Sequence, residues 1–108
     1  MGGSKPINRI TLFKIPSPDD QKRLFDIFRI MLSDAVKDGK PYILGVCAGP
    51  SFDDARNQGY TLAVISTFKS VEDMEYYDNE CEAHQALKKV AKTLHNGAMM
   101  VYFQDVLK

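Results

Sequence analysis

The amino-acid sequence predicts a single α+β domain in which a four-stranded antiparallel sheet carries its helices on one face. Short runs of β-branched and aromatic residues alternate with segments of helical periodicity, in the order β-α-β-β-α-α-β. The 108 residues suit one domain with one core. We expect this domain to span residues 7–105, after a flexible leader of residues 1–6.

The first half of the chain predicts a strand, a helix and a second strand. Residues 7–15 (INRITLFKI) are rich in β-branched side chains and end at a proline. Ser17 supplies an N-cap hydroxyl, followed by proline at the first helical position and by acidic residues in the first turn. We expect Asp38 and Gly39 to close this helix, with the glycine in a left-handed cap. A strand over residues 42–47 follows.

The second half predicts two strands around a pair of helices. A strand over residues 60–68 leads to a short helix that begins after Ser70. A second helix has its inner face between residues 83 and 94, and residues 98–103 form the last strand. This order is the split βαβ unit of ferredoxin-like folds, whose helices cover one face of the sheet.

The strands do not alternate cleanly between apolar and polar residues. On the strand over residues 60–68, apolar side chains occupy both faces, with Leu62 and Val64 on one and Ala63 and Ile65 on the other. The last strand has the same two-sided pattern. Because the helices cover only one face, we expect a second copy of the chain, a ligand or both to cover the other. Two facing sheets would form a homodimeric α+β barrel without exposed sheet edges.

Composition and charge exclude several classes of partner. Fourteen basic and fourteen acidic residues are interspersed, so no stripe of positive charge exists for nucleic acid or an anionic membrane. No apolar run has the roughly 20 residues of a membrane span. Cys47 and Cys81 lack metal-ligand spacing and fit free thiols of a cytoplasmic protein. Without a phosphate-binding glycine loop or a ligand cluster, we expect neither metal nor cofactor.

Three segments of the chain resemble a known family. GKPYILGVCAG, GYTLAVISTFKSVEDMEYY and EAHQALKK are similar, in this order and at these separations, to the stress-responsive dimeric α+β barrel (Dabb) domain. The resemblance extends from Arg9 to Phe103. It implies the ferredoxin-like fold and a homodimer.

The resemblance also implies a set of site residues. The family includes a plant polyketide (olivetolic acid) cyclase, which closes a linear poly-β-ketone by aldol condensation with histidines and tyrosines and without cofactor. Its histidine in an Ala-His pair matches His84, and its tyrosine before that histidine matches Tyr77 with one residue inserted between them. Two further family histidines fall on Arg9 and Leu62, and a pocket tyrosine falls near Arg29. The resemblance therefore implies substrate contacts at these last three positions.

His84 is the best candidate for an acid or base. It falls in the first turn of a helix, where the dipole disfavours the imidazolium, and a neutral imidazole can take a proton from carbon beside a carbonyl. Tyr77 and Asp78 are its nearest orienting partners; alternatively, His84 orders the junction between the two helices. His95 follows about 16 Å along the helix, too far to share a proton. Arg9 would bind a carboxylate or enolate oxygen, or reach solvent from its strand.

Three functions remain compatible with these residues. The first is a small-molecule binder for a hydrophobic, aromatic or polyketide-like metabolite, or a cofactor-independent lyase or cyclase with His84 as acid/base. The second is a non-catalytic stress-response protein that acts through a stable assembly. The third, a cofactor-free barrel monooxygenase, rests on fold alone. The enzyme hypotheses require an enclosed cavity beside His84.

Overall fold

The computed structural model describes residues 5–108, so residues 1–4 of the expected leader lie outside the described residues. The elements follow the expected order, with one additional hairpin. They are β1 (Ile7–Phe13), α1 (Pro18–Arg29), α2 (Met31–Asp34), β2 (Val36–Lys37), β3 (Lys40–Pro41), β4 (Ile43–Pro50), a 3-10 turn (Ala55–Asn57), β5 (Leu62–Phe68), α3 (Val71–Asn79), α4 (Glu82–Leu94) and β6 (Ala98–Phe103).

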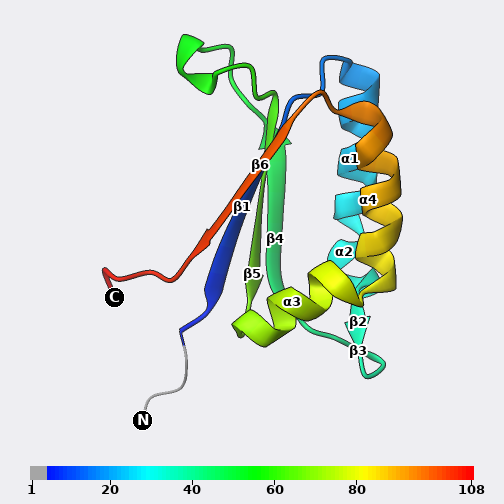
Figure 1. Cartoon of the computed structure of the whole chain (residues 1–108), viewed down its shortest axis with the longest axis vertical. Coiled ribbons are helices and arrows are strands. Elements are labelled where there is room, and N and C mark those ends of the chain that lie inside the picture. Colours follow the sequence, from blue (N-terminus) through cyan, green and yellow to red (C-terminus); the bar gives the residue numbers. More distant parts are fainter. Residues whose placement is uncertain (1–4) are drawn as a thin grey trace.

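The main sheet has four antiparallel strands in the order β4-β5-β1-β6. The helices lie on one side of this sheet, with α1 and α4 packed side by side and α3 crossing near one end (Figure 1). The first and last strands of the chain, β1 and β6, are therefore neighbours. This arrangement confirms the predicted ferredoxin-like α+β fold.

The core lies between the sheet and the helices. Alternate residues of β5 point toward the helices, and Leu62, Val64 and Phe68 are almost completely buried. Leu24 and Phe28 of α1 meet them from the helical layer. Helix α4 completes the core with buried Leu87, Ala91 and Leu94.

The opposite face of the sheet is apolar and open. Ile65 of β5 and Met99, Val101 and Phe103 of β6 have exposed fractions between 40% and 53%. The register pairs Ile10 with both Ile65 and Val101, so these side chains share one face. The two-sided apolar pattern expected from the sequence is present, and no element of residues 5–108 covers this face (Figure 1).

The predicted helix end at Asp38 and Gly39 is wrong. Helix α1 ends at Arg29, and α2 ends at Asp34 after a break at Ile30. Asp38 and Gly39 have φ of 53° and 77° and form the two-residue turn of the β2–β3 hairpin. An Asp-Gly pair satisfies the positive φ of a type I′ hairpin turn as well as that of a helix end, and here the hairpin forms.

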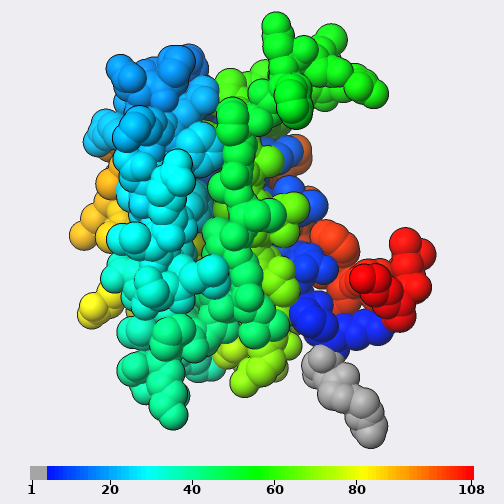
Figure 2. All heavy atoms as spheres, turned by 180° about the vertical axis from the view of Figure 1, so that it is seen from behind, coloured from blue at the N-terminus to red at the C-terminus, as the bar shows by residue number. Residues whose placement is uncertain are grey.

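Strand bounds also differ slightly from the expected ones. β1 ends at Phe13, because Ile15 turns away and its amide donates to the Thr61 hydroxyl at 2.8 Å. β4 continues to Pro50, three residues beyond the expected end. The segment between β4 and β5 then projects beyond the sheet, in bright green in Figure 2.

The two ends of the described chain lie together (Figure 2). The Lys5 ammonium donates to the backbone carbonyls of Asp105 and Lys108, at 2.9 and 2.8 Å. Cys47 and Cys81 are both free, as expected. Within residues 5–108, no helix has the length and apolar character to cross a membrane.

Candidate functional site

His84 is fixed at the junction of α3 and α4. Helix α3 ends at Asn79, and α4 begins at Glu82, so His84 lies in the first turn of α4 and faces the last turns of α3. Its ring stacks on Tyr77, with centroids 3.7 Å apart and planes 11° from parallel. Its Nδ1 lies 2.8 Å from the Tyr77 carbonyl oxygen. Since this carbonyl can only accept, Nδ1 carries the proton, and the Nε2 lone pair of the neutral ring is left available.

Arg9 and Asp78 form an ion pair beside this histidine. Arg9 comes from β1, on the face covered by the helices, and is only 9% exposed. Its Nη1 donates to Asp78 Oδ1 at 2.6 Å, and its guanidinium lies 5.5 Å from the centre of the Tyr77 ring. Asp78 Oδ1 is 3.8 Å from His84 Nδ1. Arg9 therefore faces the site, and the alternative of a strand-end charge reaching solvent is not observed.

Burial keeps His84 neutral. The pKa of the imidazole is lowered to about 4, mainly by burial; the nearby Arg9 cation acts in the same direction, whereas the Tyr77 carbonyl and Asp78 act in the opposite direction. Burial also raises the pKa of the Tyr77 phenol above its usual range. At neutral pH the stacked pair is therefore an uncharged imidazole on an uncharged phenol.

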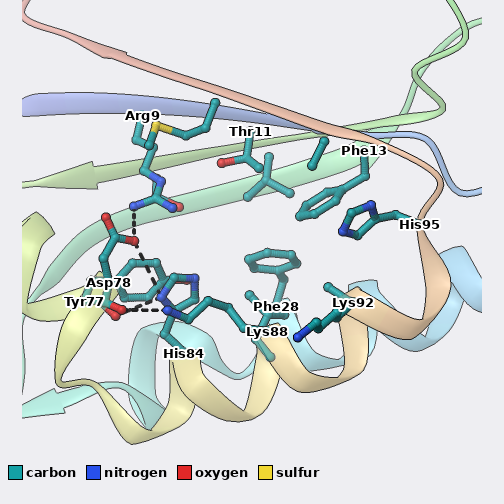
Figure 3. A pocket seen from close by; sticks show the side chains of 16 residues that line it. Arg9, Thr11, Phe13, Phe28, Tyr77, Asp78, His84, Lys88, Lys92 and His95 are labelled. Atoms are coloured by element: carbon teal, nitrogen blue, oxygen red, sulfur yellow. Dashed lines mark hydrogen bonds and ion pairs between the residues drawn. The ribbon is translucent and has the colours of Figure 1, made fainter.

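A cavity of about 360 Å³ opens beside His84, between α4 and the strands β1 and β6. His84, Tyr77, Asp78 and Arg9 lie at one end of it (Figure 3). The hydroxyls of Thr11 and Ser66 also belong to its lining. Its apolar lining consists of Phe13, Phe28, Val64, Leu87, Ala91, Ala98 and Met100. A volume of this order lies within the range of sites for small organic ligands.

Two candidate residues lie elsewhere. Leu62 is completely buried in the core at the start of β5 and is not part of the cavity lining. The Arg29 side chain is 73% exposed on α1, with its Nε 3.4 Å from Asp26 Oδ1. The structure thus brings together four of the six candidates, His84, Tyr77, Arg9 and Asp78, and leaves Leu62 and Arg29 outside.

Three basic residues of the cavity were not among the candidates. Lys88, Lys92 and His95 line it from α4 and the residue that follows α4. A signal was present in the sequence, because residues separated by 4, 8 or 11 positions from His84 lie on nearly the same side of a helix. From the sequence, His95 was set apart from His84 because of its distance along the helix axis. In the structure both residues face the same cavity.

The site offers polar groups for a substrate, and metal ligands are not grouped there. Within residues 5–108, no three His, Cys, Asp or Glu side chains are close enough to hold one metal ion. What the described residues provide is a neutral imidazole, a buried guanidinium–carboxylate pair and two hydroxyls around an apolar space. This arrangement can exchange a proton with a carbon acid and hydrogen-bond an oxygen next to it.

Comparison with known sequences gives one family and a fungal relative. Residues 7–104 match the family model described as "Stress responsive A/B Barrel Domain". A fusaristatin A biosynthesis cluster protein of Gibberella zeae is 42% identical over 99 residues, which are 91% of this chain and 72% of that protein.

Solved structures agree in fold at much lower identity. A dimeric ferredoxin-like protein of unknown function from Thermobifida fusca is similar with a TM-score of 0.76 at 18% identity, covering 94% of this chain and 92% of that one. The hydroxynitrile lyase of Passiflora edulis has a TM-score of 0.78 at 14% identity, covering 96% of both chains. At these identities the similarity is evidence for a shared fold alone.

Proposed function

The chain belongs to the stress-responsive A/B barrel domain family, and from this premise we propose that its cavity binds a hydrophobic, aromatic or polyketide-like small molecule and acts on it as a cofactor-independent lyase or cyclase. The observation that carries the proposal is His84, a buried neutral histidine whose tautomer is fixed by Tyr77 at the end of an apolar cavity. The fungal relative, described as a biosynthesis cluster protein, supports a role on a small metabolite.

The proposed chemistry begins with proton transfer from carbon. His84 Nε2 takes a proton from the carbon between two carbonyls of the ligand, which leaves an enolate and an imidazolium. The enolate carbon attacks another carbonyl farther along the same molecule, forming the ring C–C bond. The alkoxide then takes the proton back from His84, so all atoms balance without an oxidant or a cofactor. The reverse sequence cleaves a C–C bond, as a lyase does.

Neighbouring groups support the charges that arise in these steps. Asp78, at 3.8 Å from Nδ1, stabilises the transient imidazolium. The guanidinium N–H groups of Arg9 that do not bind Asp78, and the hydroxyls of Thr11 and Ser66, are the donors for enolate or alkoxide oxygen. The apolar lining limits contact between the enolate and water on the side of the core, whereas Ala98 and Met100 of β6 are partly exposed and leave the cavity open there.

A synthetic linear tetraketide thioester tests this proposal. The protein should raise the yield of the ring formed by C–C closure over the spontaneous lactone, as measured by chromatography and mass spectrometry. His84→Gln should lower turnover by roughly 10²- to 10⁴-fold. Lys89→Gln, on the exposed side of α4 and outside the cavity, is the matched control and should keep full activity. Equal turnover in the wild type and the His84 variant would refute the catalytic role.

We further propose that two copies pair through their open sheet faces to form a barrel. The proposal is supported by the exposed Ile65, Met99, Val101 and Phe103, which together form an apolar face. The Thermobifida fusca protein of similar fold is described as dimeric. The same face also favours the alternative function, a non-catalytic stress-response protein that acts through its assembly. That alternative predicts an inert His84 and an intact dimer.

We also propose a cytoplasmic location. The support is that Cys47 and Cys81 are both free thiols, which fits a reducing compartment. Fractionation of the source cells tests this, and recovery from a secreted fraction would contradict it.

A further inference from the structure

Helix α4 places one histidine at each end of the cavity. Eleven residues separate His84 from His95, which corresponds to about three full helical turns and about 16 Å along the axis. Both therefore lie on the same side of the helix. Figure 3 shows His84 beside Tyr77 at one end and His95 beside Phe13 at the other, with Phe28 between them.

The two ends differ in how well their polar groups are satisfied. At the first end, His84 Nδ1 bonds to the Tyr77 carbonyl, and Arg9 is paired with Asp78. At the second end, His95 Nδ1 is buried and has no hydrogen-bond partner within residues 5–108. The His95 ring packs against Phe13, with centroids 5.6 Å apart. A buried nitrogen without a partner destabilises the empty site. The His95 residue as a whole is half-buried and lines the cavity, so a rotation of its ring brings this nitrogen to a ligand atom and removes the penalty.

Lys92, whose side chain is exposed, adds positive charge near this second end, whereas Lys88 reaches back to Asp78 at the first end. Lys88 and Lys92 belong to the lining and stand one helical turn apart, where like charges repel. Neither has a carboxylate within 4 Å in the described chain, and Lys88 donates only to the backbone carbonyl of Asp78, at 2.6 Å. Lys92 precedes His95 by three residues, so the two side chains are neighbours on the helix surface.

We propose that His95 and Lys92 form a carboxylate subsite and that the ligand of this cavity is an elongated apolar carboxylate. Its acid group pairs with Lys92 and His95, and its chain lies along Phe28, Leu87 and Ala91. Its other end reaches His84. The inference rests on the proposed function in one respect, that this cavity is the binding site. It adds the charge, the orientation and the chemical class of the ligand.

Octanoate and its uncharged analogue 1-octanol test the subsite directly. In titrations of the whole chain followed by ¹H–¹⁵N NMR, octanoate should bind at least about tenfold more tightly than 1-octanol, the factor expected for one charge-assisted contact. Acetate, which lacks the chain, should bind far more weakly than octanoate. Equal affinities for octanoate and 1-octanol would overturn the proposal.

Variants on one helix locate the binding charge. Lys92→Gln should weaken octanoate about tenfold and leave 1-octanol unchanged, and His95→Phe, which keeps a ring against Phe13, should also weaken octanoate selectively. Lys89→Gln removes a charge from the same helix outside the cavity and should change neither affinity. Equal losses in the Lys92 and Lys89 variants would indicate unspecific attraction and overturn the subsite.

The His84 variant separates this inference from the proposed reaction. His84→Gln should lower tetraketide turnover by roughly 10²- to 10⁴-fold and keep octanoate affinity within about threefold, since the carboxylate lies at the opposite end. If octanoate binding is lost with His84, the carboxylate lies at the wrong end and the subsite is refuted. If octanoate selectivity holds while no cyclisation is found, only the proposed reaction fails.

Discussion

Both faces of the sheet carry apolar side chains, but the helices cover one face and leave the other open. On β5, Leu62 points toward the helices and is completely buried, whereas Ile65, three residues later, points away and is 40% exposed. The face toward the helices also contains polar groups, Arg9 and Ser66, and each of these is buried at the cavity. The open face of β6 presents only apolar side chains, at Met99, Val101 and Phe103.

This difference assigns different tasks to the two faces. Buried polar groups are costly unless they are paired, so Arg9 and its partner Asp78 mark the covered face as the one that carries chemistry. The open face is apolar apart from Asn8 and Thr67, which hydrogen-bond to each other, and a largely apolar exposed surface is typical of protein–protein contact. The candidate reaction site and the candidate dimer interface thus lie on opposite faces of the same sheet.

We expect the largest difference in thermal stability between two variants that place a charge on opposite faces of β5. Leu62→Asp places a carboxylate where the side chain has no exposed surface and should destabilise the chain by about 4 kcal/mol, a large part of the stability of a small domain. Ile65→Asp, on the open face, should leave the single chain folded. Thermal unfolding followed by circular dichroism distinguishes them. Similar melting temperatures for the two variants would show that the faces are not distinct.

A charge on the open face of β6 should act on assembly. Purified wild-type protein at micromolar concentration should sediment at about twice the chain mass, whereas Val101→Lys should sediment as a folded single chain, because a lysine there cannot be buried against a second apolar sheet. Val106→Lys is the matched control, since Val106 is 85% exposed and lies after β6. A wild type that remains a compact monomer would contradict the proposed barrel.

Much of this two-faced fold could be predicted from the sequence. The β-branched and aromatic residues of 60–68 and 98–103 indicated the strands, and the lack of clean apolar–polar alternation along them indicated the second apolar face. The β2–β3 hairpin was missed because strands of two residues have no periodicity, and an Asp-Gly pair also suits a helix end. The break at Ile30 has no local signal either, since the apolar stripe continues through it.

The site was only partly predictable, for a geometric reason. Tyr77, Asp78 and His84 are close in sequence, so a helix junction was sufficient to bring them together. Arg9 is far from His84 in the sequence and reaches the site only because β1 is part of the sheet. Its position in β1 places it on the face that the helices cover. Leu62 and Arg29 were predicted as site residues only from the family resemblance. Leu62 is instead buried in the core and Arg29 is exposed on α1, and both outcomes depend on tertiary packing that no local sequence pattern encodes.

The stability of the chain should depend on pH through His84 on the covered face. Because the pKa of His84 falls from its usual 6.5 to about 4 in the folded chain, the unfolded chain takes up a proton between these values and the folded chain does not. Stability should therefore fall by about 3 kcal/mol as the pH falls from about 6.5 to about 4. Urea unfolding at a series of pH values measures this slope. His84→Gln should flatten it, and an unchanged slope in that variant would refute the buried neutral imidazole.

The smallest effect is expected from the ion pair that marks the covered face. Asp78→Asn keeps the size of the side chain and removes the charge that faces Arg9 at 2.6 Å. Arg9 would then be a buried cation with only a neutral acceptor. Since Asp78 is itself 30% exposed, water offsets part of this loss, and we expect a destabilisation of about 2 kcal/mol.

Asp26→Asn provides the comparison for this variant. Asp26 pairs with Lys22 and Arg29 on the exposed surface of α1, where ion pairs contribute little, so its replacement should change stability by less than about 0.5 kcal/mol. Urea unfolding at neutral pH measures both variants. If Asp78→Asn costs no more than Asp26→Asn, Arg9 does not depend on its carboxylate, and the covered face would not hold its polar groups in the fixed geometry that proton transfer at His84 requires.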